Sequence, residues 1–169
     1  ILEGFNKIQK RMEKEEGIIN AGAITLYTPK EGPGVWGKFG QVSIKGSYYF
    51  DIFEEPENYY IIQTKSENID TYAIRLKEVI DTITYKTGSK KVNLVAFSMG
   101  GLVARRYLQV FGEEQVGKLI TIGTPHLGIE GEVLRLCSLT GEERECKDMD
   151  KTSLFMNKLN RGILPMIPF

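Results

Sequence analysis

Two apolar stretches separated by a helical pattern constrain the fold of this chain more than any other feature. Val92–Phe97, with the sequence VNLVAF, is typical of a buried strand, and it stops at Ser98. A helical pattern then covers Leu102–Phe111 and ends at Gly112. A second buried-type strand is predicted for Val116–Gly123. Strands that alternate with helices favour a parallel sheet, so the sequence predicts an α/β fold.

The preceding residues contain further helix and strand signals. Apolar spacing predicts one helix that ends at Gly17 and another that runs from Ser66 to Gly88. Between them the residue types predict a strand over 23–29, a glycine-rich loop or hairpin over 30–46, a strand over 47–53, a turn over 54–58 and a strand over 59–65. The complete pattern predicts a mostly parallel sheet flanked by helices.

Length and charge narrow the class of protein. A chain of 169 residues is ordinarily one domain, here 1–169. Basic and acidic residues number 22 each, so the net charge gives no argument for nucleic acid or an anionic membrane as a partner. The chain opens on an uncapped helical pattern at Ile1 and closes on the apolar run ILPMIPF. We therefore expect a partial domain, truncated at both ends.

One glycine pattern resembles a nucleotide-binding loop. Gly32, Gly34 and Gly37 form a G-x-G-x-x-G, and Lys45 follows. The distance to Lys45 is too short for a kinase loop, and alternating residues follow where a dinucleotide site needs a helix. The pattern therefore indicates a glycine-rich turn, and no cofactor is expected.

Ser98 has the surroundings of a nucleophile elbow, a tight turn between a strand and a helix. Such a turn crowds the positions two before and two after the serine, and here these are the small residues Ala96 and Gly100. Gly101 would let the helix pack closely on the strand. The next backbone N–H, on Met99, could stabilise an oxyanion. The alternative is a serine that serves as an ordinary helix cap.

Three segments carry a resemblance to a known superfamily. VNLVAFSMGGLVARRYL over 92–108 resembles the nucleophile segment of α/β-hydrolase lipases. LITIGTPHLG over 119–128 resembles the following strand and loop in triacylglycerol lipases and in GPI-inositol-deacylase-like and palmitoyl-thioesterase-like relatives. CKDMDKTSLFMNKLN over 146–160 is similar to a segment of bacterial lipases and esterases that follows the lid.

The resemblance implies an α/β-hydrolase fold with Ser98 as nucleophile and Met99 as one oxyanion donor. The second donor usually lies in an H-G loop, and this sequence contains no H-G dipeptide. The acid and the histidine of the family follow later strands, in the chain order Ser, Asp, His. The resemblance places the next strand at about 166–169, so the catalytic Asp and His are expected outside this chain.

His126 is the only histidine in the sequence. It lies only a few residues past the strand expected beside the nucleophile strand, and it lacks the preceding acid that the family's chain order requires. In the relatives this motif shapes the edge of the pocket. We expect His126 at the pocket edge rather than as the catalytic base. Asp148 and Asp150 are candidate acids by residue type only, because they lie in a polar turn before a helix.

Cys137 and Cys146 flank a polar turn, and the sequence leaves open whether they form a disulfide. If bonded, they favour a secreted or membrane-associated protein, and as free thiols they would fit the cytoplasm. Two cysteines and one distant histidine do not form a standard zinc site, so no metal is expected. Residues 129–150 are a candidate lid or cap over the acyl pocket, with an ordinary packed insertion as the alternative.

These observations predict a serine hydrolase that cleaves carboxylic esters of lipids or small acyl substrates through an acyl-enzyme on Ser98. An acyltransferase or a thioesterase on the same fold is one alternative. A non-catalytic lipid-binding relative is another. The expected partner is a lipid or acyl-ester substrate, with contact to a lipid interface and no nucleic acid. The acyl-chain length and the role of residues 29–46 are left open.

Overall fold

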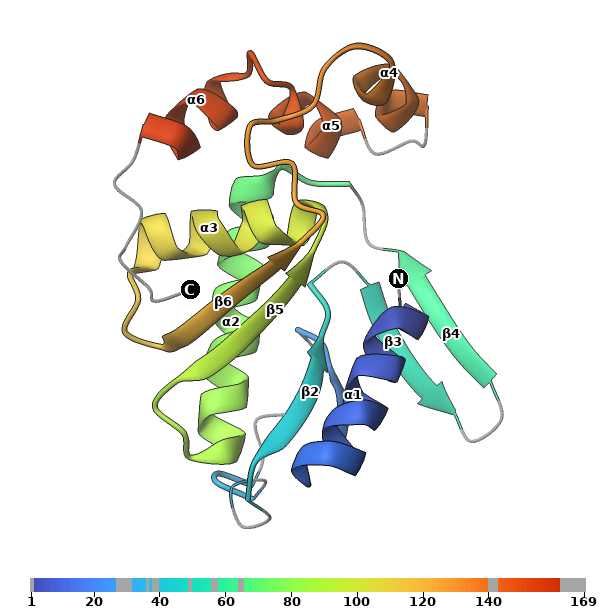
Figure 1. Cartoon of the computed structure of the whole chain (residues 1–169), viewed down its shortest axis with the longest axis vertical. Helices are drawn as coiled ribbons and strands as arrows, with labels where there is room; N and C mark the ends of the chain where they lie inside the picture. Colours follow the sequence, from blue (N-terminus) through green and yellow to red (C-terminus); the bar gives the residue numbers. More distant parts are fainter. Residues whose placement is uncertain are drawn as a thin grey trace. The chain divides into compact units, whose positions relative to one another are not determined.

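The computed structural model describes residues 2–26, 32–35, 37, 40–48, 50–55, 58–63, 66–139 and 143–161. This range contains helices and short strands, two pairs of which are parallel, and this confirms the predicted α/β class (Figure 1). The elements are α1 (Leu2–Glu16), β1 (Ile19–Ile24), β2 (Val42–Gly46), β3 (Phe50–Glu55), β4 (Asn58–Gln63), α2 (Ile69–Thr87), β5 (Val92–Phe97), α3 (Met99–Phe111), β6 (Val116–Ile122), α4 (Gly131–Leu139), α5 (Glu143–Met149) and α6 (Leu154–Arg161). The predicted strand at about 166–169 lies outside the described residues.

The chain divides into two compact units. The first comprises Ile1–Gln63 and Glu78–Lys90, and the second comprises Thr64–Lys77 and Lys91–Phe169. Helix α2 therefore contributes its first half to one unit and its second half to the other. Among the described residues, no helix is both long enough and apolar enough to cross a membrane.

In the first unit, β1 and β2 pair in parallel, whereas β3 and β4 form an antiparallel pair. Over 30–46, where a glycine-rich loop or hairpin was predicted, the described residues form turns followed by β2, which pairs with β1 outside this segment. The connection over 25–41 is long enough for parallel pairing, which needs a crossover of about a dozen residues or more. The predicted strand over 23–29 is also displaced, since β1 already begins at Ile19.

The glycine-rich turn packs against the end of α2 in the same unit. The N–H of Gly34 donates to the carbonyl oxygen of Tyr85 over 2.8 Å. A Cβ on Gly37 would lie 2.0 Å from the carbonyl oxygen of Thr87. No side chain fits there, so close packing accounts for this glycine without a nucleotide.

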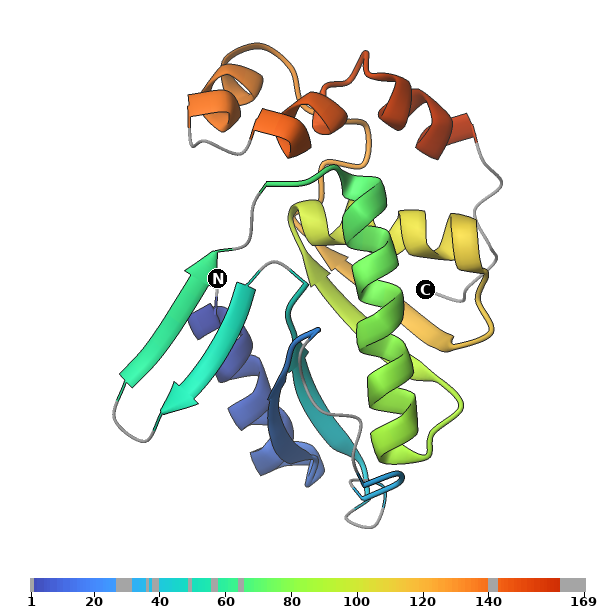
Figure 2. The ribbon, with the colours of Figure 1, turned by 180° about the vertical axis from the view of Figure 1, so that it is seen from behind.

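In the second unit, β5 and β6 pair in parallel, with Phe97 opposite Ile122 at their carboxyl ends. Helix α3 lies on one face of this pair, and α4, α5 and α6 lie beyond the carboxyl ends of the strands (Figure 2). Helix α3 begins at Met99, earlier than the predicted Leu102. Its buried face includes Leu102, Val103 and Tyr107, each at most 1% exposed.

The two strands are less buried than predicted. Side chains on one face of the pair remain exposed: Val95 (40%), Phe97 (42%), Ile120 (55%) and Ile122 (41%). The prediction of buried-type strands therefore holds for only one face of the pair. The apolar run satisfied the pattern of a buried strand, but α3 packs on only one of its two faces.

Candidate active site

Ser98 lies at the junction of β5 and α3, where its backbone adopts φ 52° and ψ −130°. It is the one non-glycine residue with a positive φ among the residues that the structure describes. A side chain in this region is sterically strained, and such strain persists only where surrounding contacts hold it. The turn therefore has to be maintained by its neighbours.

Three hydrogen bonds hold the backbone of Ser98. Its N–H donates to the carbonyl oxygen of Ile122 over 2.8 Å, which extends the parallel pairing by one step. Its carbonyl oxygen accepts from the N–H of Gly101 over 3.1 Å and from the hydroxyl of Thr124 over 2.8 Å. Both peptide groups of Ser98 are thus tied to neighbouring elements.

The hydroxyl of Ser98 is not used to cap the helix. No side-chain capping bond to α3 is formed, and within the described residues no hydrogen bond to this hydroxyl is found. The alternative of an ordinary helix cap therefore does not fit the local geometry. The side chain is half-buried, at the carboxyl end of β5 and directly before the N-terminus of α3.

Gly101 allows α3 to approach its neighbour closely, but that neighbour differs from the predicted one. A Cβ on Gly101 would lie 2.1 Å from Oγ1 and 2.6 Å from Cγ2 of Thr124. The close contact is therefore made with a residue just after β6 rather than with the strand before the turn. Sequence reasoning missed Thr124, although it stands in the quoted LITIGTPHLG segment.

Met99 is the first residue of α3 and is 9% exposed. The N-terminus of a helix carries a partial positive charge, so this position favours a negative charge nearby. Its backbone N–H belongs to the same peptide group as the carbonyl oxygen of Ser98, which Thr124 holds.

His126 contacts the end of β6 and α3. One ring nitrogen, Nε2, lies 3.0 Å from the hydroxyl of Thr121, and Nδ1 lies 3.4 Å from Nη1 of Arg105. His126 is exposed as a residue, but partial desolvation of its ring lowers its pKa, and the positive charge of Arg105 lowers the pKa further. Among the described residues, no hydrogen bond joins this ring to Ser98. The structure therefore does not bring together the two residues that a catalytic pair would need.

Arg105 links three segments around this region. This side chain of α3 is 7% exposed, and its Nη1 also donates to the carbonyl oxygen of His126 over 3.1 Å. Its Nη2 donates to Oδ1 of Asn160 on α6 over 2.8 Å. The sequence analysis did not single out Arg105, because an arginine within a helical pattern is usually exposed.

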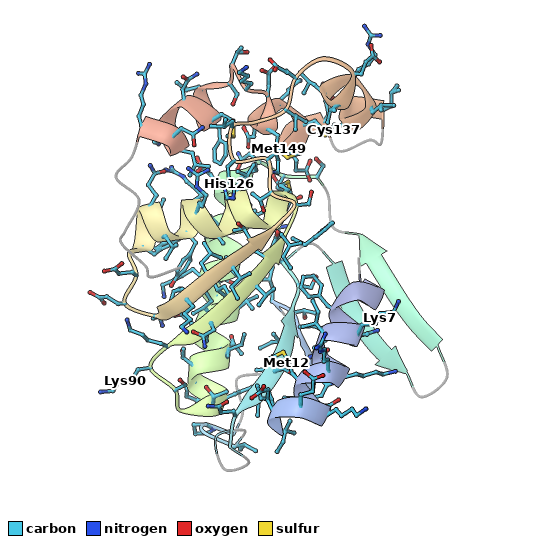
Figure 3. All side chains as sticks on the ribbon, in the orientation of Figure 1. Lys7, Met12, Lys90, His126, Cys137 and Met149 are labelled. Carbon is cyan, nitrogen blue, oxygen red and sulfur yellow. A yellow bond between two sulfur atoms is a disulfide. The ribbon has the colours of Figure 1, made fainter. Side chains whose placement is uncertain are left out.

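The two ends of the segment 129–150 lie next to each other. Ile129 forms an isolated parallel bridge with Asp150, and its N–H donates to the carbonyl oxygen of Met149 over 2.8 Å. Between these ends, a disulfide joins Cys137 on α4 to Cys146 on α5. Figure 3 labels His126, Cys137 and Met149, which lie near the carboxyl ends of β5 and β6.

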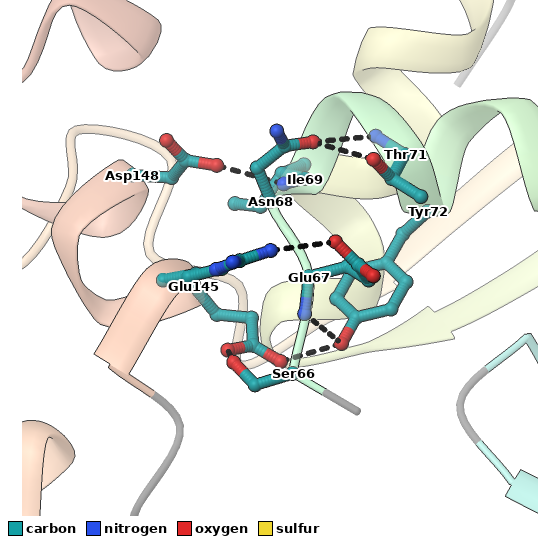
Figure 4. Close-up of polar contacts among 9 residues, drawn as sticks. Ser66, Glu67, Asn68, Ile69, Thr71, Tyr72, Glu145 and Asp148 are labelled. Carbon is teal, nitrogen blue, oxygen red and sulfur yellow. Dashed lines mark hydrogen bonds and ion pairs between the residues drawn. The ribbon is translucent and has the colours of Figure 1, made fainter. Parts of the chain in front are cut away.

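Helix α5 is fixed to the start of α2 by polar contacts (Figure 4). Glu145 is fully buried and accepts hydrogen bonds from the hydroxyls of Ser66 and Tyr72, the latter over 2.5 Å. Asp148 accepts from the N–H of Ile69 over 2.7 Å. Arg144 and Glu67 form an ion pair over 3.0 Å.

The two candidate acids therefore occupy helix ends. Asp148 accepts from the N–H of Ile69 at the start of α2. Its pKa is raised by burial and by the negative charges of Asp70 and Glu145. Asp150 accepts from the N–H and the hydroxyl of Thr152, which holds the turn before α6. These bonds show that both carboxylates stabilise local structure.

Comparison with known proteins places this arrangement in a class. A parallel strand, a sharp turn at Ser98 and a helix that follows at once belong to the α/β-hydrolase fold, which is the fold of the matching family. The match extends over residues 34–163, and the chain belongs to the palmitoyl protein thioesterase family. This membership confirms the resemblance to lipases and esterases noted from the sequence.

Individual relatives match shorter segments. The phospholipase A(1) LCAT3 of Arabidopsis thaliana is 34% identical over 70 residues, which are 40% of this chain and 16% of that protein. Triacylglycerol lipases of Pseudarthrobacter phenanthrenivorans and Burkholderia plantarii are each 39% identical over 56 residues, or 33% of this chain. The chain spans 16%, 17% and 15% of the length of these three curated relatives.

Proposed function

We propose that this protein is a serine hydrolase acting on lipid esters or thioesters, with Ser98 as its nucleophile. The observation that carries the proposal is the strained backbone of Ser98 between β5 and α3. This strand, turn and helix match the arrangement that exposes the nucleophile in α/β-hydrolases. The names of the family and of the relatives, which are those of thioesterases, phospholipases and lipases, support the same chemistry.

The reaction would proceed in two steps. Oγ of Ser98 attacks the carbonyl carbon of the substrate, and the alcohol or thiol departs to leave an acyl-enzyme. Water then attacks this intermediate, which releases the carboxylic acid and restores the serine. The N–H of Met99 would donate a hydrogen bond to the oxyanion of each tetrahedral intermediate.

His126 would line the edge of the acyl pocket and would not act as the base. Its contacts with Thr121 and Arg105 support this assignment. The base and its acid would come from residues outside 1–169. The segment 129–150 would act as a lid or cap over the pocket. Its two ends are joined by the bridge between Ile129 and Asp150, which supports a discrete insertion.

A thioester substrate is the second candidate. The family match favours it, because the family is named for a thioesterase activity. Parallel assays of a p-nitrophenyl ester and an acyl thioester by the whole protein would separate the two by their ratio of kcat/KM. An acyltransferase would instead require an added alcohol or amine acceptor for full turnover.

The experiment that tests the nucleophile compares Ser98→Ala with His126→Ala in the whole protein. Ser98→Ala should abolish turnover and labelling by a fluorophosphonate, since only the hydroxyl can form the acyl-enzyme. His126→Ala should keep substantial turnover. A folded wild-type protein that never labels at Ser98 would indicate a non-catalytic lipid-binding relative. Equal losses in both variants would mean that His126 is the base.

A further inference from the structure

Thr124 is the only side chain that hydrogen-bonds to the backbone of Ser98 among the described residues. Its hydroxyl donates to the carbonyl oxygen of Ser98 over 2.8 Å. The other two bonds to this backbone come from main-chain groups, at Ile122 and Gly101. Thr124 is therefore the described position at which a side-chain substitution can remove a hydrogen bond from the backbone of Ser98.

The packing around Thr124 leaves little freedom for movement. All three side-chain atoms lie within 2.8 Å of the place where Gly101 would carry a Cβ. The side chain thus fills the space that the missing Cβ leaves at the first turn of α3. A shift of the Ser98 turn toward this neighbour would press against Thr124.

A peptide group is planar, so one hydrogen bond to its oxygen restricts the direction of its N–H as well. The carbonyl oxygen that Thr124 holds and the N–H of Met99 belong to the same peptide group. The hydroxyl of Thr124 therefore constrains the N–H that the proposed mechanism uses as an oxyanion donor.

We infer that Thr124 is a positioning residue that orients the Ser98–Met99 peptide group for catalysis. This inference depends on the proposed function, because it assigns a role to the donor of that mechanism. Oxyanion donors act only where they point at the developing charge, and losing one typically costs ~10²–10³ in rate. A misdirected donor should cost less, on the order of tenfold, and it should act on kcat rather than on KM.

The test uses two pairs of variants that each differ by one hydroxyl. Wild type and Thr124→Val have nearly the same shape, and Thr124→Ser and Thr124→Ala differ by a single oxygen. We expect Thr124→Val and Thr124→Ala to lower kcat about tenfold or more, with KM changed less than about twofold. Thr124→Ser should restore kcat to within about threefold of wild type.

Further measurements distinguish a folding defect, a hydroxyl without a role and a wrongly assigned nucleophile. Thermal unfolding of each variant shows whether it is folded, and the smaller Ser and Ala side chains cannot clash with Gly101. Equal kcat for Thr124→Ser and Thr124→Ala would overturn the inference, because the hydroxyl would then have no role. Turnover that persists in Ser98→Ala would instead refute the proposed function itself.

Discussion

The backbone of Ser98 adopts a conformation that glycine adopts more easily than residues with a side chain. At φ 52° and ψ −130° the cost for a non-glycine residue is about 1–3 kcal/mol. Glycine loses more conformational entropy on folding, about 0.5–1 kcal/mol relative to alanine. We therefore predict that Ser98→Gly raises the free energy of unfolding by about 1 kcal/mol, as measured by urea denaturation.

The matched control is Ser98→Ala, which keeps the Cβ and hence the strain. Its stability should lie within about 0.5 kcal/mol of wild type. Both variants should be inactive. If Ser98→Gly is no more stable than Ser98→Ala, the positive φ carries no strain in solution.

His126 should titrate below the usual range of a histidine. Partial desolvation of the ring and the charge of Arg105 both disfavour its protonated form and lower its pKa. A lowered pKa means that His126 contributes stability above about pH 6.5, and that this contribution is lost as the pH falls through the folded pKa. We predict an NMR midpoint below about 6.5 for the ring protons.

The comparison variant for this titration is Arg105→Gln, which removes the positive charge and keeps a hydrogen-bond donor. The pKa of His126 should rise in this variant. The partial desolvation of the ring remains, so the pKa of His126 should not return fully to the model-peptide value. An unchanged midpoint would exclude Arg105 as a cause of the shift.

At the scale of single residues, the sequence could predict Ser98 because its signal is local. Small neighbours, a preceding strand and a following helix are all visible within a few positions. Thr124 and Arg105 could not be predicted in the same way, because their partners are 26 and 21 positions away and depend on how β6 and α3 pack.

Among the elements, α5 is held to the start of α2 by two carboxylates, the buried Glu145 and the half-buried Asp148. The pKa of Asp148 is raised, first by burial and then by the charges of Asp70 and Glu145. A raised pKa means that Asp148 contributes most stability below its unfolded pKa, and that this contribution is lost as the pH rises through the folded pKa.

We predict that Asp148→Asn becomes more stable relative to wild type as the pH rises from 3 to 7. Asparagine keeps an acceptor for the N–H of Ile69 but carries no charge. Asp148→Ala should be about 1 kcal/mol less stable than Asp148→Asn, because that N–H loses its partner. Chemical denaturation at a series of pH values checks both statements, and parallel curves for wild type and Asp148→Asn would contradict the first.

The disulfide joins α4, which has several exposed apolar side chains, to α5, which is held to α2 by polar contacts. Helix α5 makes buried contacts with α2, whereas α4 exposes Val133 (60%), Leu136 (61%) and Leu139 (76%). A cross-link that closes so short a loop adds about 3 kcal/mol by loss of chain entropy in the unfolded state. We predict that Cys137→Ser with Cys146→Ser lowers the stability of this segment by a similar amount.

Hydrogen exchange measured by mass spectrometry would test this prediction. The amides of α4 should exchange faster in the double variant, while those of β5 and α3 stay protected. Unreduced wild-type protein should show no free thiol at either cysteine. Two free thiols would contradict the bond.

The pattern of elements was predictable where apolar spacing is regular. The ends of α1 and α2, and both strands of the second unit, follow their apolar stripes and closing glycines. Pairing was not predictable for 30–46, because glycine-rich sequence fits a hairpin as well as a long crossover. The exposure of Ile120 and Ile122 was also not predictable, since an apolar run does not reveal which neighbour will cover each face.

For the molecule as a whole, the proposed chemistry depends on a base, and among the described residues no side chain hydrogen-bonds to the hydroxyl of Ser98. A serine hydroxyl keeps its proton at neutral pH unless a base removes it. A general base contributes about 10²–10⁴ in rate. The only histidine of this chain is His126, whose ring contacts Thr121 and Arg105 instead.

We therefore predict that a protein made of residues 1–169 alone hydrolyses p-nitrophenyl esters no faster than its own Ser98→Ala variant, even when circular dichroism shows that it is folded. The whole protein should hydrolyse the same esters in a reaction that Ser98→Ala abolishes. Both measurements need matched concentrations and a detergent series, because lipid-directed hydrolases differ in their response to aggregated substrate. Strong turnover by residues 1–169 that disappears in both Ser98→Ala and His126→Ala would place a complete catalytic pair within this chain. That result would require His126 to leave Thr121 and turn toward Ser98 when substrate binds.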